Sequence, residues 1–110
     1  MSRYLGLFTS VEDVWNEFSI TKEDVKDREI VFAFYEQGSY DGSAQVLIYR
    51  KKKLYEISSS HCSCYGLEGT WAPQEVTWEQ LAMRKFGYYP EDKETRAALL
   101  ELIRQHVPRA

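Results

Sequence analysis

Apolar residues recur along this chain with two different periods, and each period predicts a different kind of element. Near the N-terminus four apolar residues follow one another three or four positions apart, which places them on one stripe of a helix: Val11, Val14, Trp15 and Phe18. This spacing predicts an amphipathic helix over residues 10–18 whose stripe packs into the core. The hydroxyl groups of Thr9 and Ser10 are suited to capping the free N–H groups at its start.

Three later segments are rich in β-branched and aromatic residues and predict strands, over residues 29–35, 44–49 and 54–58. The first is apolar on both faces, so we expect it to be central. Glycines and an Asp-Gly pair in residues 37–43 predict a turn after it, and the basic run of residues 50–53 predicts the next turn. Connections this short allow only antiparallel neighbours, so the pattern predicts a meander of about three strands.

The C-terminal third predicts two more helices. Thr77 and Gln80 match a capping box, which favours a helix over residues 78–86 that ends at Gly87. A last helix is expected over residues 91–106, acidic at its start and basic at its end. We therefore predict a single α+β domain spanning residues 1–110, with an antiparallel β-meander packed against an N-terminal helix and two C-terminal helices.

Composition narrows the classes of function. The 110 residues are 44% hydrophobic and carry a net charge of −3, with an isoelectric point near 5.4, so the chain as a whole lacks the basic footprint of a nucleic-acid binder. The basic run at residues 50–53 is interpreted as a solvated hairpin tip; a nucleic-acid site there would use Tyr49 and Tyr55. No stretch approaches the roughly 20 apolar residues of a membrane helix, and the first residues lack a signal-peptide core, so a cytoplasmic protein is expected.

Both cysteines and one of the two histidines lie in residues 58–71. In a meander the loops after the first and third strands leave from the same end of the sheet. We therefore expect Tyr40 and Asp41 to approach Ser60, His61 and Cys62 in space. We call this end, formed by residues 37–43 and 58–71, the loop pole.

The residue types of the loop pole permit a small enzyme. A thiolate beside a histidine is a nucleophile, but His61 and Cys62 are adjacent and point to opposite faces of an extended chain. A Cys–His pair would therefore need Cys64 with His61 across a tight turn, or the distant His106 folded back. A metal site would take His61, Cys62 and Cys64 with Asp41, although the spacing is not that of paired Cys-x2-Cys zinc ligands. Small thiols also pack as buried apolar groups. We expect packed cysteines and no cofactor.

The remaining interpretation of the loop pole is a binding surface. Six of its residues offer ring faces and hydrogen-bonding groups to a partner: Tyr40, Asp41, Ser60, His61, Tyr65 and Glu68. We predict that these residues form the contact, and that none of them is catalytic. The sequence leaves the oligomeric state open.

Four segments carry a resemblance: FYE at residues 34–36, GSYDGSA at 38–44, KLYE at 53–56 and SHCSCYGLEGTW at 60–71. They resemble a group of small proteins encoded by bacteriophages and prophages, usually without an assigned function, over about residues 31–84. The resemblance implies a phage origin and a location in the cytoplasm of an infected or lysogenic bacterium. It favours a binder of a host or phage protein, including host defences such as CRISPR, over an enzyme, and a mechanism of steric occlusion or sequestration.

Overall fold

The computed structural model describes residues 3–37, 41–62, 67, 69–83 and 93–107. The chain divides into two compact units, one over residues 2–75 and one over residues 76–110. The first unit holds the N-terminal helix and nearly all of the sheet, and the second holds the C-terminal helices. The prediction of one domain over residues 1–110 stays a prediction.

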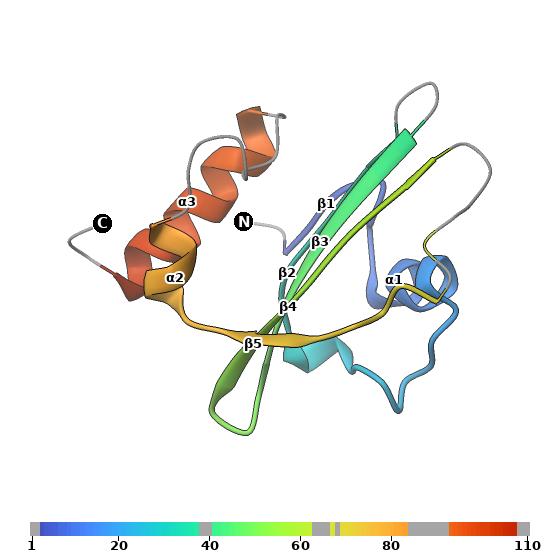
Figure 1. Cartoon of the computed structure of the whole chain (residues 1–110), viewed down its shortest axis with the longest axis horizontal. Coiled ribbons are helices and arrows are strands. Elements are labelled where there is room, and N and C mark those ends of the chain that lie inside the picture. The colour runs from blue at the N-terminus through green and yellow to red at the C-terminus, as the bar shows by residue number, and fades with distance from the viewer. Residues whose placement is uncertain (1–2, 38–40, 63–66, 68, 84–92, 108–110) are drawn as a thin grey trace. The chain divides into compact units, whose positions relative to one another are not determined.

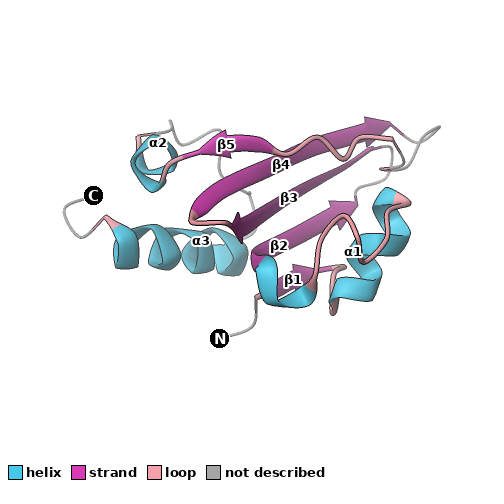
Figure 2. Ribbon diagram, turned by 90° about the horizontal axis from the view of Figure 1, so that it is seen from below, coloured by secondary structure: helices cyan, strands magenta, loops and turns pink. Residues whose placement is uncertain are grey.

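The sheet has five strands in the order β1-β2-β3-β4-β5 (Figure 1). Their bounds are Tyr4–Gly6, Ile30–Gln37, Asp41–Arg50, Lys53–Cys62 and Gln74–Val76. Strands β2, β3 and β4 are antiparallel neighbours, whereas β1 runs parallel to β2. Figure 2 shows β1 beside β2 at one edge and β5 beside β4 at the other.

The predicted antiparallel meander of about three strands is therefore wrong, although the chain is α+β. The central hairpins are present, but β1 and β5 add one strand at each edge of the sheet. Strand β1 is parallel to β2, so the sheet is mixed. Each of these edge strands is only three residues long, which is too short to display a period of two. Strand β1 is parallel because helix α1 and the segment after it connect it to β2, as a crossover rather than a hairpin.

Helix α1, Val11–Phe18, contributes its apolar stripe to the core on one face of the sheet. The predicted core positions Val11, Val14 and Phe18 are buried there. The predicted hydroxyl cap is wrong, because Ser10 holds the N-cap position without a side-chain hydrogen bond. Instead the N–H and hydroxyl of Thr9 donate to Oδ2 of Asp13 at 2.8 and 2.6 Å, and the hydrogen bonds from Thr9 lower the pKa of that carboxyl.

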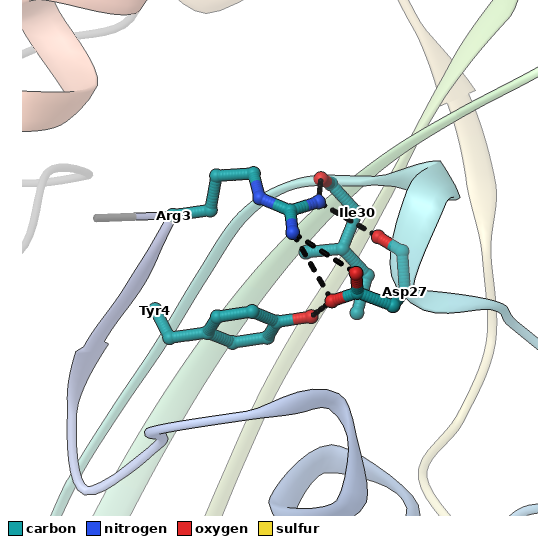
Figure 3. Close-up of polar contacts among 4 residues, drawn as sticks. All are labelled: Arg3, Tyr4, Asp27 and Ile30. Carbon is teal, nitrogen blue, oxygen red and sulfur yellow. Dashed lines mark hydrogen bonds and ion pairs between the residues drawn. The ribbon is translucent and has the colours of Figure 1, made fainter. Parts of the chain in front are cut away.

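Strand β1 is held by a polar cluster around the short 3-10 helix η1, Asp27–Glu29 (Figure 3). The Arg3 guanidinium donates to both carboxylate oxygens of Asp27 at 3.1 Å and to the backbone carbonyls of Asp27 and Ile30 at 2.8 and 2.9 Å. The Tyr4 hydroxyl donates to the same carboxylate at 2.5 Å. Burial and this bond raise the pKa of Tyr4, and bonds from Tyr4 and Arg3 lower the pKa of Asp27.

The second unit contains α2, Trp78–Ala82, and α3, Lys93–His106. The capping box before α2 is confirmed, because Gln80 N–H donates to Thr77 Oγ1 at 3.1 Å and Thr77 N–H donates to Gln80 Oε1 at 2.9 Å. Helix α2 ends before the predicted residue 86, and residues 84–92 lie outside the described part of the chain. The Trp78 ring stacks on the His106 ring, with centroids 4.1 Å apart.

Candidate functional site

Strand register brings the two loops of the loop pole to the same end of the sheet. Gln37 pairs with Gly42 between β2 and β3, and Asp41 pairs with Cys62 between β3 and β4. Gly42 is likewise opposite His61. The expected approach of Asp41 to this segment is therefore confirmed for the backbone.

The structure describes the predicted contact residues unequally. Ser60 is fully described and exposed on β4. For Asp41, His61 and Cys62 the structure describes the strand backbone. The other predicted residues lie outside the described part of the chain: Tyr40, Cys64, Tyr65 and Glu68. The binding roles assigned to these residues stay predictions.

Strand β4 is longer than its sequence predicts. The expected end was residue 58, yet β4 continues to Cys62 and stays paired with β3 along its full length. The segment that was expected to be loop therefore begins as strand. His61 and Cys62 have the extended backbone on which the argument against a direct Cys–His pair depends.

Four polar residues share one face of the sheet near the loop pole, and we call them the serine face: Glu36, Ser43, Ser58 and Ser60. Glu36 is opposite Ser43, and Ser43 is opposite Ser60, so these three form one row across β2, β3 and β4. The Ser43 hydroxyl donates to Glu36 Oε1 at 3.3 Å. All three serines are exposed and Glu36 is half-buried. Ser60 was predicted to contribute; the others were missed, although alternation along β3 and β4 relates them.

A buried polar pair lies beside the serine face. Gln45 is opposite Ser58, and its Nε2 donates to Oε2 of Glu56 at 2.7 Å. The two residues are only 9% and 7% exposed. A buried carboxylate is costly unless it is hydrogen-bonded, so this bond fixes both side chains. The pair adjoins the exposed Ser58 on the same side of the sheet.

Neither enzymatic alternative is tested by the described side chains. Within residues whose side chains the structure describes, no group of three His, Cys, Asp or Glu residues is arranged to hold a metal ion. The proposed ligands His61, Cys62, Cys64 and Asp41 are outside that set. A thiol nucleophile and a metal site both stay hypotheses about these four residues.

The alternative nucleic-acid site lies at the other end of the β3–β4 hairpin. Two of its cationic side chains there contact carboxylates of the same chain. Arg50 Nε and Nη2 donate to the Glu29 carboxylate at 2.6 and 3.1 Å, which raises the pKa of Arg50 and lowers that of Glu29. Lys53 lies 3.7 Å from Glu75. Tyr55 packs against the hydrophobic core, whereas Tyr49 is 49% exposed. Two cations of the basic run thus have carboxylate partners within the chain, whereas Lys51 and Lys52 are exposed at the turn.

The described residues thus define a small α+β protein with a mixed sheet and a polar strand end. Comparisons with protein-family models, with curated proteins and with solved structures each found no match. Among the described helices, none is long and apolar enough to cross a membrane.

Proposed function

We propose that this chain is a small phage-type binding protein that acts on a host or viral macromolecule through the loop pole. It works by steric occlusion or sequestration in the cytoplasm of an infected or lysogenic bacterium. The resemblance over about residues 31–84 favours a binder of host proteins, which include defence systems such as CRISPR. The observation that supports a shared contact surface most directly is the pairing of Asp41 with Cys62, which joins the two segments of the pole.

The serine face supports binding rather than a purely structural end of the sheet. Its exposed hydroxyls donate and accept hydrogen bonds, and they carry no charge that a partner must neutralise. The neighbouring Gln45 and Glu56 side chains are already held by their hydrogen bond, so they have little side-chain order to gain on binding. Loops positioned by a rigid sheet are common carriers of recognition.

The test is capture of a partner from a lysate of a bacterial host by the tagged full chain. Tyr40→Ala and Tyr65→Ala should each reduce capture at least about tenfold, because truncating an aromatic anchor typically costs 2 kcal/mol or more. The matched control is Tyr49→Ala, which removes an exposed tyrosine at the far end of β3 and should leave capture unchanged. All three variants should keep the thermal melt.

Retained capture by both pole variants would contradict the proposed surface. A parallel experiment separates binding from catalysis. Thiol labelling of Cys62 and Cys64 near neutral pH, together with elemental analysis of the purified chain, should show slow labelling and no stoichiometric zinc. Fast labelling or bound zinc would favour a thiol or metal enzyme that uses His61.

A further inference from the structure

The outer edge of β4 is covered along only part of its length. Strand β3 pairs with all ten residues of β4, but β5 on the other side has three residues. The ion pair between Glu75 and Lys53 places β5 beside the start of β4, and Figure 2 shows β4 continuing beyond β5. Among the backbone hydrogen bonds that join described residues outside the strand ladders, none involves Ser58 or Ser60.

The hairpin turn determines which backbone groups point outward. Two residues separate β3 from β4, and the closing pair of such a hairpin, Arg50 and Lys53, is a hydrogen-bonded pair. In an antiparallel ladder these pairs alternate with non-hydrogen-bonded pairs. Counting along β4, Ser59 bonds to β3, whereas Ser58 and Ser60 direct their N–H and C=O groups away from it. The open edge therefore presents donors and acceptors at two alternate residues.

We propose that this edge pairs with the same edge of a second copy of the chain, antiparallel and about a two-fold axis beside Ser59. In this register Ser58 of one copy lies opposite Ser60 of the other, and each such pair exchanges two backbone hydrogen bonds. The arrangement is self-complementary, as a two-fold interface requires. Every outward donor of the two serines meets an acceptor of the other copy.

Charge and side-chain size argue for a second copy as the occupant. Across a two-fold axis a residue meets its own kind nearby, so a charged edge repels itself, and edge strands commonly carry lysine or proline for this reason. The segment Ser58-Ser59-Ser60 carries neither, and its side chains are small. By contrast, β5 contains Glu75 and follows Pro73, and β1 is only three residues long. The β4 edge at Ser58–Ser60 therefore lacks the charge, proline or shortness that keeps other edges from pairing, and it is self-complementary.

This inference goes beyond the proposed function. Residues opposite one another in an antiparallel pair point to the same side of the sheet. The two serine faces would therefore adjoin on one side of a continuous sheet. A dimer would present twice the hydroxyl-rich surface of one chain.

The experiment measures the mass of the full chain by light scattering and sedimentation over a wide concentration range. The wild-type chain should show a concentration-dependent dimer. Ser60→Pro should raise the dimer dissociation constant at least tenfold, because it removes an outward N–H without breaking a bond to β3. Ser60→Ala is the control, since it removes the hydroxyl and keeps the N–H, and should dimerise normally.

A second pair of variants keeps the test informative if the proline variant fails to fold. Ser58→Lys adds a charge at the edge and should weaken the dimer at low salt, whereas Ser43→Lys adds the same charge one strand inward and should not. A monomeric wild-type chain, or a dimer that survives Ser60→Pro with a native melt, would overturn the proposal. So would a monomer that binds a foreign peptide strand at this edge. A wild-type chain that dimerises but captures no partner would contradict the proposed function and leave the dimer proposal intact.

Discussion

Gly6→Ala should destabilise the chain strongly, because of where the parallel strand β1 ends. Gly6 has φ of +67° and pairs with Tyr35 on β2. A Cβ atom at this position would lie 2.2 Å from the carbonyl oxygen of Tyr35. That oxygen also accepts a 2.8 Å hydrogen bond from the Leu7 N–H, so it cannot move away without loss. Backbone conformation and close approach both require glycine.

The size of the effect follows from three terms. Left-handed backbone costs alanine about 1–2 kcal/mol, and the lower entropy of the unfolded alanine chain returns about 0.4–1 kcal/mol. The collision with the Tyr35 carbonyl adds about 1–3 kcal/mol, as overpacking does elsewhere. The free energy of unfolding should fall by about 2–4 kcal/mol, which for a chain of this length is a drop in Tm of roughly 8–15 °C.

Gly69→Ala is the matched control. Gly69 has φ of +76°, yet a Cβ atom there would meet nothing within 4 Å. It should therefore cost only the backbone terms, about 0.5–1 kcal/mol. Urea and thermal unfolding followed by circular dichroism measure both variants. Equal losses at the two positions would mean that Gly6 does not approach Tyr35, and would refute the parallel register of β1.

Two further predictions concern the hairpin tip and its ion pair. Lys51 and Lys52 form the turn with φ of +52° and +67°, so Lys52→Gly should raise the free energy of unfolding by about 0.5–1 kcal/mol. Lys53→Gly, in the strand, should lower it by a similar amount, about 0.5–1 kcal/mol, and a loss at both positions would contradict the turn geometry. Arg50 lowers the pKa of Glu29, so the stability this carboxylate contributes is present above its unfolded pKa and is lost as pH falls through its folded pKa. Glu29→Gln should flatten the acid side of a stability profile from urea unfolding; an unchanged slope would show that the pair contributes nothing.

The sequence predicts those parts of the fold that show a period. Helix α1 has four apolar residues at helical spacing, and β2 is a continuous β-branched and aromatic run, so both were found. The capping box at Thr77 was found for a similar reason, because its two partners are only three residues apart. Each of these signals is local and involves several residues.

The parts that were missed depend on long-range contacts. The direction of β1 follows from the crossover through α1, and its place beside β2 is supported by the contact of Arg3 with Asp27, which no local pattern shows. The end of β4 was missed because serine is a weak strand former, and only the register with β3 keeps Ser58–Cys62 extended. The Gln45–Glu56 bond joins two strands, and only the register places its partners together. The candidate site was thus located by topology, while its serine face needed the structure.

The change of character along β4 gives the serine face and the open edge a common origin. From Leu54 to Ile57 every residue of the strand is buried or half-buried. From Ser58 onward two exposed positions carry serine, where threonine or valine would favour a strand more. Folding alone gives no reason for that choice. Small serine side chains, however, leave the serine face accessible to a partner. They also leave the backbone groups at the outer edge of β4 unobstructed. Ser60→Ala removes a hydroxyl from the face and Ser60→Pro removes a donor from the edge, so one position separates partner binding from self-association.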